Sequence, residues 1–276
     1  MCLLKNFTRY FIESDMIKTL RITVFALAVT YLLPNAVFPF EGNDKKVSFS
    51  AKMTFAQKYM WRGIDFQDDD PALQPEVVLD FGGSGAYLGL WGNYALDAAW
   101  HKWDEIDIFT GYYFSLWEGR LSELKVDLFY TYFYFPRQDR DENSHEVALA
   151  FRMPGLFHAT ETICLMPYIA FYYGWSPKGF DTFWNKLGID CAIPVHALLP
   201  WQKEQFLNMY LETFYNDGYK PLESKAGFSH IATGLYTTFE WYGINMMPNI
   251  NYQWTLEDTI NKEDEFWYTF ILSYNF

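Results

Sequence analysis

Apolar and polar residues alternate with a period of two along most of the chain after residue 45. In residues 46–61 one parity is apolar and aromatic, and the other carries mainly Lys, Ser and Thr. Because successive side chains of a strand point to opposite faces, this alternation predicts strands with one apolar and one polar face. The pattern predicts about twelve strands, at residues 46–61, 74–81, 86–97, 103–114, 122–135, 144–153, 161–173, 184–193, 205–215, 228–241, 246–255 and 266–276.

Charged residues identify the polar face of these strands. In residues 122–135, for example, Lys125 and Asp127 alternate with Leu124, Val126 and Leu128. The same separation recurs in most of the segments, so we expect the charged parity to line the interior of a barrel and the apolar parity to face lipid. The candidate pore-lining residues are Lys52, Lys58, Glu76, Asp80, Glu105, Asp107, Lys125, Asp127, Glu146, Arg152, Lys186, Asp190, Glu212 and Glu240.

Alternation alone fits a β-sandwich, a soluble barrel or a membrane barrel. A soluble barrel of about twelve strands with its apolar face inward would leave a void, because barrel diameter grows with strand number. A sandwich would not need aromatic residues near strand ends, whereas membrane barrels carry aromatic girdles there. Pairs such as Tyr59 and Trp61 lie near predicted strand ends. We therefore predict an all-β fold, a transmembrane antiparallel up-and-down β-barrel of about twelve strands.

The connections and the last strand agree with that prediction. Long, charged connections such as residues 62–73 and 256–265 are expected at one rim, and short turns such as residues 82–85 at the other. Residues 266–276 alternate up to Phe276. This strand resembles the terminal strand by which outer-membrane proteins are recognised, so the barrel-assembly machinery is an expected partner.

The first forty residues have the order of a secretory signal. Lys18 and Arg21 precede the apolar residues 22–33, and small residues follow near Ala36. We expect residues 1–40 to be a signal peptide, with translation starting either at Met1 or at Met16, and residues 41–276 to form the barrel. The alternative is a short amphipathic helix of the folded domain. The apolar run is too short to span a bilayer as a helix.

Composition excludes several classes of function. Aromatic residues make up 21% of the chain, which argues against disorder despite the net charge of −13. That acidity argues against nucleic acid as a partner, because neutralising phosphates requires clustered Lys and Arg. Cys164 and Cys191 are not in a metal-ligand spacing, and we expect them to be small buried hydrophobic residues. The sequence indicates no metal and no cofactor.

Residues 57–114 resemble the TorF-type porins, a family of bacterial envelope proteins. The resemblance lies in the segments 61–63, 70–74, 85–92 and 105–112, and its central residues are Tyr59, Trp61, Arg62, Gly63, Pro71, Gln74, Gly85, Tyr87, Gly89 and Trp91. It implies an outer-membrane β-barrel of porin type, located in the outer membrane of a Gram-negative-type bacterium and in contact with its lipid and lipopolysaccharide. It implies no catalytic residues.

Three features of the sequence can each be interpreted in two ways. Arg62 either pairs with an acidic residue across the barrel mouth or is an exposed rim residue. The run Asp68–Asp70 lacks the glycine of an EF-hand and suggests a surface loop that loosely collects divalent cations. Ser229 and His230 suggest a lipid hydrolase, but strand neighbours point to opposite faces, which argues against direct contact.

These observations favour a passive outer-membrane channel for small polar solutes, water-filled or partly plugged. The predicted inner face is mixed but net acidic, so we expect a mild preference for cations. Inward rings, including Tyr87, Trp91, Phe129 and Phe133, leave open a substrate-specific channel for nucleosides or sugars. The pattern is also compatible with a non-conducting barrel serving as an adhesin or anchor, with a barrel lipid hydrolase and with a soluble sandwich.

Overall fold

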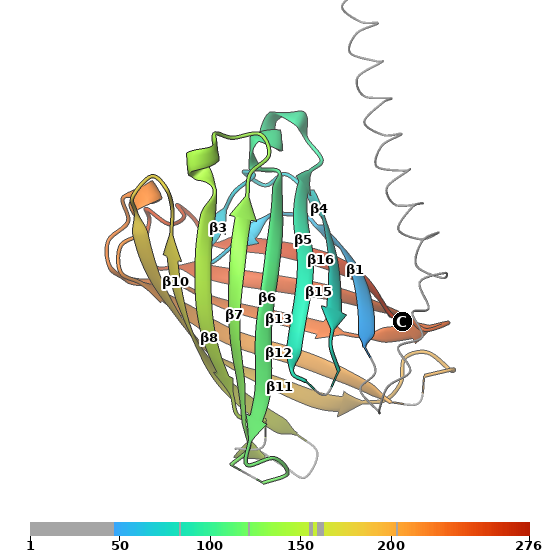
Figure 1. Ribbon diagram of the computed structural model, residues 1–276. Helices are drawn as coiled ribbons and strands as arrows, with labels where there is room; N and C mark the ends of the chain where they lie inside the picture. Colours follow the sequence, from blue (N-terminus) through green and yellow to red (C-terminus); the bar gives the residue numbers. More distant parts are fainter. Residues whose placement is uncertain (1–46, 83, 121, 155–156, 159–162, 203) are drawn as a thin grey trace, which may run out of the picture. The chain divides into compact units, whose positions relative to one another are not determined.

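The computed structural model describes residues 47–82, 84–120, 122–154, 157–158, 163–202 and 204–276. The signal peptide expected at residues 1–40, with its alternative start at Met16, lies outside these residues. Residues 45–276 form one compact unit. Its wall is a closed antiparallel barrel of twelve strands (Figure 1), namely β1 (Ser48–Ala56), β4 (Ala72–Asp80), β5 (Ala86–Ala95), β6 (Glu105–Leu116), β7 (Leu124–Tyr134), β8 (Ser144–Arg152), β10 (Cys164–Trp175), β11 (Asp181–Val195), β12 (Gln205–Asn216), β13 (Gly227–Thr237), β15 (Ile244–Thr255) and β16 (Glu265–Asn275).

Each strand of the wall pairs with its neighbour in the chain, and β16 pairs with β1 to close the ring. The predicted all-β barrel of about twelve strands is therefore confirmed. Short strands and 3-10 helices lie in the connections, namely β2 (Met60–Trp61), β3 (Ile64–Asp65), β9 (Phe157–His158), β14 (Phe239–Trp241), η1 (Ala98–Trp103), η2 (Arg140–Glu142) and η3 (Lys220–Leu222). No described helix is long and apolar enough to cross a membrane.

The strand register separates the two faces of the wall. Lys125 on β7 pairs with Arg152 on β8, and Arg152 pairs with Tyr168 on β10, so polar side chains share one face across neighbouring strands. The opposite parity is apolar and exposed: Leu128 is 53% exposed and Leu187 is 56% exposed. Burying such residues in hydrocarbon is favourable, whereas leaving a band of them in water is not. The apolar face is the outer face of the barrel.

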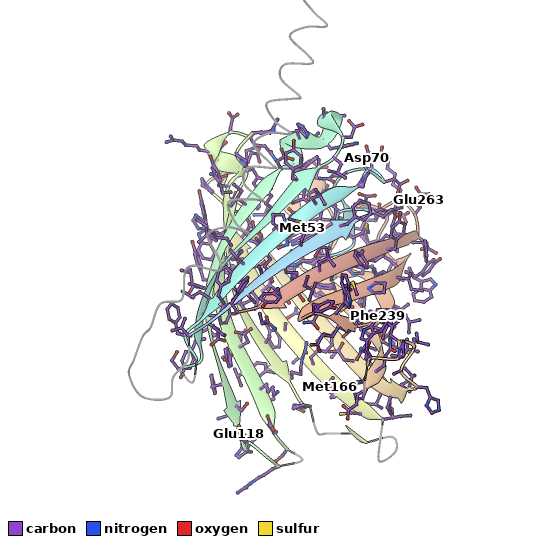
Figure 2. The ribbon with its side chains drawn as sticks, turned by 90° about the vertical axis from the view of Figure 1, so that its right-hand side faces the viewer. Met53, Asp70, Glu118, Met166, Phe239 and Glu263 are labelled. Carbon is purple, nitrogen blue, oxygen red and sulfur yellow. The ribbon has the colours of Figure 1, made fainter. Side chains whose placement is uncertain are left out.

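The connections alternate between two rims. The loop end carries the connections after β1, β5, β7, β10, β12 and β15, including the three 3-10 helices, and the turn end carries the others (Figure 1). Figure 2 places Asp70 and Glu263 at the loop end and Glu118 at the turn end. The expected difference in length holds only in part, because the loop at residues 176–180 is shorter than the turn at residues 117–123.

The connection after β1 folds into the barrel. We call this connection, residues 57–71, the plug segment; it contains the two-stranded hairpin β2–β3. The expectation that residues 62–73 form an outward loop is wrong, and so is the assignment of Tyr59 and Trp61 to a girdle. The first strand ends at Ala56 rather than Trp61. The physical reason is that these aromatic residues find ring and carboxylate partners on the inner wall, which water outside the rim would not supply.

A two-residue turn makes the plug hairpin tight. Arg62 and Gly63 have φ values of 50° and 92°, the positive pair that type I′ hairpin turns require. A Cβ at Gly63 would also lie 2.4 Å from Nδ1 of His230. Glycine is therefore needed at this position both for the backbone conformation and for the close approach to β13.

The buried core of the barrel lies at the loop end, around the plug. Ile64 packs with Trp184, Phe214 and Ile260, and further rings pack against this cluster, namely Trp61, Phe66, Tyr172 and Tyr219. Ile260 and Tyr219 come from the loops after β15 and β12. This buried hydrophobic cluster is thus built from three loop-end connections and the inner wall.

Candidate functional site

The plug segment reaches most of the inner circumference of the barrel. Its side chains and backbone contact residues from at least nine of the twelve wall strands; these residues are Trp91, Glu105, Phe133, Glu146, Tyr172, Trp184, His230, Gln253 and Glu265. A loop attached only at its ends would not acquire partners on opposite walls. The plug is therefore seated across the lumen.

Arg62 is the best-connected residue of the plug. Its two terminal nitrogens donate to the two carboxylate oxygens of Glu146, each at 2.7 Å. Its guanidinium carbon lies 4.4 Å from the ring centre of Trp61 and 4.2 Å from that of Tyr172. Burial alone would lower the pKa of Arg62, but the ion pair with Glu146 outweighs it and raises that pKa. Arg62 therefore forms an ion pair with an acidic residue and is not an exposed rim residue.

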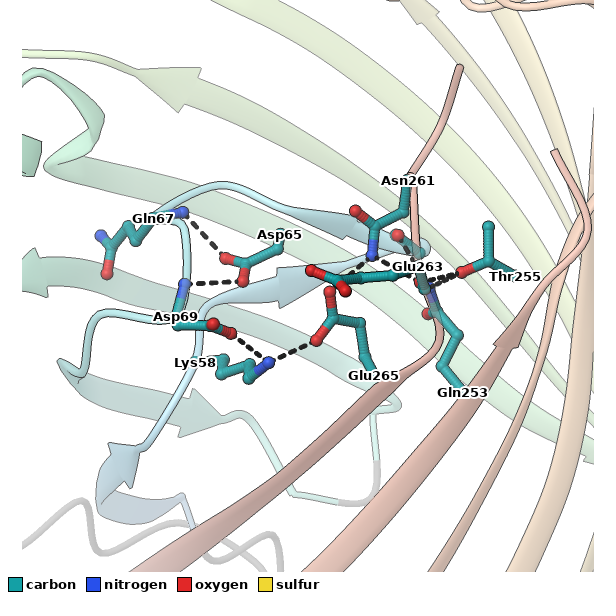
Figure 3. A network of polar contacts seen from close by, with 10 residues as sticks. Lys58, Asp65, Gln67, Asp69, Gln253, Thr255, Asn261, Glu263 and Glu265 are labelled. Atoms are coloured by element: carbon teal, nitrogen blue, oxygen red, sulfur yellow. Dashed lines mark hydrogen bonds and ion pairs between the residues drawn. The ribbon is translucent and has the colours of Figure 1, made fainter. Parts of the chain in front are cut away.

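A second ion-pair network ties the plug to β16. Lys58 contacts the carboxylates of Asp69 and Glu265 (Figure 3). Asp65 accepts backbone hydrogen bonds from Gln67 and Asp69, which fixes the turn between β3 and β4. Burial alone would lower the pKa of Lys58, but its two carboxylate partners raise it. Burial raises the pKa of the Asp65 carboxyl, and this effect outweighs the two backbone hydrogen bonds, which alone would lower that pKa.

This network bears on the expected divalent-cation loop. Asp65, Asp69 and Glu265 bring carboxylate oxygens within 4.8 Å of one another. The ammonium group of Lys58 already contacts two of them. The Lys58 ammonium offsets one of the three negative charges and lies against Asp69 and Glu265, where a metal ion would otherwise have to bind. The cluster connects the plug segment to β16.

Tyr59 connects the plug to a pair of acidic residues on β6. Its hydroxyl donates to Glu105 at 2.6 Å, and burial raises the pKa of Tyr59 well above its ordinary value. Asp107 lies two residues further along the same inner face of β6. Both carboxylates are buried, at 5% and 8% exposure. The plug therefore covers two carboxylates on one strand.

A cavity of about 470 Å³ lies at the loop end beside the plug. Its lining combines aromatic rings with a few charged groups, including Glu105, Glu142, Glu146 and Lys178. His145 stacks on Trp175 with ring centres 5.3 Å apart, which makes one wall flat. Burial raises the pKa of Tyr219, at another wall, to about 12. The size is typical of small-molecule pockets. We call this cavity the vestibule.

Ion pairs and tyrosines also cover the wall outside the plug's contacts. Arg152 pairs with Asp190 at 3.5 Å and Lys186 with Glu212 at 2.6 Å. Tyr168 donates to Glu212 at 2.7 Å and lies beneath both cations. A Cβ at Gly188 would clash with this tyrosine ring, so the glycine lets the ring lie flat across β11. This part of the lumen wall therefore carries two neighbouring ion pairs.

The predicted pore-lining residues fall into three groups. Lys58 is in the plug segment. Glu240 lies on the short strand β14 and is exposed, and it pairs with Asn245, which shares the inner parity with Ser273 and Lys52. The predicted strand 228–241 is interrupted after Thr237, but Glu240 keeps the inner parity expected for it. The other twelve share the inner parity of the wall, namely Lys52, Glu76, Asp80, Glu105, Asp107, Lys125, Asp127, Glu146, Arg152, Lys186, Asp190 and Glu212.

Sequence reasoning missed one inner carboxylate. Glu265 is the first residue of β16 and pairs with Gln253 on the inner face. The sequence pattern does not assign Glu265 to a strand, because it belongs to a run of three acidic residues, 263–265, that suggests a loop. The alternation of Trp267 and Thr269 on the same parity is the signal that could have assigned it inward.

The expected separation of Ser229 and His230 is wrong. The register between β12 and β13 shifts at Phe214 and Tyr215, so Ser229 has no partner across the ladder. This bulge turns both side chains to the inner side, where Ser229 Oγ lies 2.9 Å from Nδ1 of His230. Both residues are buried beneath the plug, at 0% and 2% exposure, and Ser229 also donates to the carbonyl of Phe214. A buried hydroxyl held in this way is not presented to a lipid.

Comparisons with known proteins agree with this architecture. Among solved structures, the barrel is similar to the KdgM porin, with 10% identity, a TM-score of 0.50, and coverage of 83% of this chain and 99% of that chain. Other similar structures are LpxR from Salmonella typhimurium (10% identity, TM-score 0.47, 82% and 99% coverage) and the COG4313 outer membrane channel from Pseudomonas putida F1 (10% identity, TM-score 0.45, 87% and 98% coverage). At such identities the likeness to KdgM concerns the fold alone.

The sequence itself matches a family. A search of curated proteins finds no match. Residues 41–190 match the family described as "Bacterial protein of unknown function (Gcw_chp)". The match includes residues 57–114, which carry the resemblance to TorF-type porins, but the TorF name stays unconfirmed. Because the matched region exceeds half of the chain, this protein belongs to the Gcw_chp family of bacterial proteins.

Proposed function

We propose that this protein is an outer-membrane channel for small polar solutes whose lumen is narrowed at the loop end by the plug segment. The observation that carries the proposal is the separation of faces: an exposed apolar outer face and a charged inner face on one closed barrel. An outer apolar band with a polar interior is the arrangement of membrane channels. The porin-type fold of the barrel supports it.

The inner face also supports a mild preference for cations. Its wall strands carry four basic residues, Lys52, Lys125, Arg152 and Lys186. They carry nine acidic residues, namely Glu76, Asp80, Glu105, Asp107, Asp127, Glu146, Asp190, Glu212 and Glu265. A net negative wall attracts cations and repels anions. Because many of these charges are paired, the preference is mild.

Location and assembly follow from the same proposal. The exposed apolar outer face suits outer-membrane lipid and lipopolysaccharide, with an export signal at residues 1–40. The last strand pairs with the first, and Phe276 donates its backbone N–H to Phe49 while the two rings pack at 5.5 Å. A terminal strand that closes the barrel is a suitable element for the barrel-assembly machinery to recognise.

A second candidate function is a barrel that does not conduct, serving as an anchor or adhesin. It is favoured by one observation, the contacts of the plug with nine wall strands. A lipid hydrolase is disfavoured because Ser229 and His230 are buried. The channel and the sealed barrel differ in whether the plug leaves a path for water and ions. A measurement of conductance across a bilayer distinguishes the two.

The test is a recording from purified protein in planar bilayers with a gradient of KCl. We expect discrete conductance steps and a reversal potential of the sign that indicates K⁺ preference. A protein that stays silent after verified insertion would favour the sealed barrel. A clear anion preference would overturn the proposed role of the acidic inner face.

A further inference from the structure

Glu105 lines the vestibule, and Asp107 follows it two residues along the same inner face of β6. Among the described residues, no Lys, Arg or His nitrogen lies within 4.0 Å of the carboxylate oxygens of Glu105 or Asp107. The other buried inner carboxylates differ, because Glu146 has Arg62 and Glu265 has Lys58; the half-buried Asp80 and Asp127 bind tyrosine hydroxyls instead. The structure thus neutralises its buried acids in pairs but leaves this pair without a basic partner.

The geometry of the pair favours a positive group beside it. Glu105 and Asp107 lie two residues apart on the inner face of β6, so their carboxyl groups are neighbours. Two ionised carboxylates so close together repel each other, and a cation bound beside Glu105 would reduce that repulsion. Oδ1 of Asp107 has no hydrogen-bond partner, although this residue is only 8% exposed. An unpartnered buried oxygen is costly unless something fills its place.

The rest of the vestibule is suited to an organic cation rather than a bare metal ion. Glu105 opens on the cavity, whose walls include the rings of Trp61, Phe66, Phe133 and Trp175. Aromatic faces attract ammonium groups and cover alkyl bodies. A calcium ion would need six or more oxygen ligands, which this ring-lined wall does not offer. The cavity of about 470 Å³ admits a small molecule.

The protein already uses this chemistry next to the vestibule. The guanidinium of Arg62 lies between the rings of Trp61 and Tyr172 and against the Glu146 carboxylate. We propose that the vestibule binds a compact organic cation of the alkylammonium class, with its charge at Glu105, which neighbours Asp107, and its body against the aromatic wall. The further step, that this cation also passes through the barrel, rests on the proposed channel function. The binding of the cation in the vestibule does not depend on that function.

The test measures binding of choline to the purified full-length protein in detergent by titration calorimetry and tryptophan fluorescence. The matched probe is 3,3-dimethyl-1-butanol, which has the same shape without the charge. We expect saturable binding of choline and about tenfold weaker binding of the neutral alcohol. Equal binding of the two probes, or no saturable binding of choline, would overturn the inference.

Variants locate the site. The double substitution Glu105→Gln with Asp107→Asn should weaken choline binding about tenfold or more. The control Glu118→Gln with Glu123→Gln removes two carboxylates at the turn end and should leave binding unchanged. Trp175→Leu, on the aromatic wall, should weaken binding independently, and circular dichroism checks that each variant keeps its strands. Unchanged binding in the Glu105 and Asp107 variant would place choline elsewhere and contradict the inference.

Bilayer recordings separate this inference from the proposed function. Choline binding by a protein that carries no current would overturn the channel but support the vestibule. Conductance without choline binding would support the channel and overturn the cation site in the vestibule. With both intact, choline added on the loop-end side should interrupt the current in wild-type protein and should do so less in the Glu105 and Asp107 variant.

Discussion

At the scale of the residue, Arg62 holds the plug most firmly. It combines a bidentate bond to Glu146 with stacking on two rings, and its side chain is buried. Removing one partner of a buried ion pair leaves the other charge without compensation, which costs about 3–5 kcal/mol. An effect of that size shifts the balance between a seated and a displaced plug by about a hundredfold or more. Arg62 is therefore the residue whose loss should open the lumen.

We predict that Arg62→Ala raises single-channel conductance in planar bilayers. Guanidinium chloride should then restore the low conductance, because the free cation fits between Trp61, Tyr172 and Glu146 in place of the side chain. Sodium chloride at equal concentration is the control and should not restore it. If conductance is unchanged in Arg62→Ala, the ion pair does not hold the plug.

Lys58 gives the plug a dependence on pH. We predict that Lys58→Met displaces the plug at pH 7.5, because Asp69, Glu265 and Asp65 then face one another without the ammonium group. The pKa of Asp65 is raised in the seated state, so acid favours that state as the pH falls through this pKa. Conductance of the variant should be high at pH 7.5 and approach the wild-type value near pH 4.

The wild-type protein is the control for this pH series. The pKa of Lys58 is raised above its ordinary value of 10.5, so its stabilisation is complete at lower pH and is lost only as the pH rises through that raised value. Wild-type conductance should therefore vary little with the charge of Lys58 between pH 4 and 7.5. High conductance of Lys58→Met at both pH values would contradict the role assigned to the carboxylates.

At the scale of the element, the plug is separable from the wall. Ala56, the last residue of β1, pairs with Ala72, the first residue of β4, so a short turn can join the two strands directly. We predict that replacing residues 58–70 by Asn-Gly leaves a folded barrel with larger conductance, because the hydrogen bonds that close the wall do not involve the plug. Liposome swelling should then admit sugars that wild-type protein excludes. Loss of the barrel fold would show that the plug is part of its core.

The sequence allowed the wall to be predicted but not the plug. Alternation assigns Leu128 outward and Asp127 inward because each position depends only on the period of its own strand. The same alternation runs on through Tyr59 and Trp61, so nothing marks the end of β1 at Ala56. Whether that segment turns inward depends on partners from nine strands far away in the chain.

The candidate site was predictable to a similar extent. Arg62 and Glu146 were each identified, yet their pairing needs the three-dimensional placement of the plug against β8. The turn at Gly63, between Trp61 and Ile64, is a local hairpin signal that could have indicated an inward fold. The bulge at Ser229 has no local signal, because a register shift is decided by the pairing of β13 with β12.

At the scale of the whole molecule, the outer face determines where the protein resides. We predict that Leu187→Arg, at a position 56% exposed on the outer face of β11, destabilises the membrane-inserted barrel by about 2–4 kcal/mol. Urea unfolding in lipid vesicles measures this change. The matched control Leu198→Arg changes a leucine that is 70% exposed in the connection between β11 and β12, and it should have little effect. Equal stabilities of the two variants would argue against lipid contact at Leu187.

The barrel as a whole rests on the assignment of the charged face to a water-filled interior. Single cysteines at positions 127 and 128 test it, in a plug-replaced background in which Cys2, Cys164 and Cys191 are also replaced. A cationic methanethiosulfonate reagent is added during bilayer recording. Asp127→Cys should lose current because the attached group enters the conducting path, and Leu128→Cys should not respond because it faces lipid. A response at position 128 with none at position 127 would contradict the account.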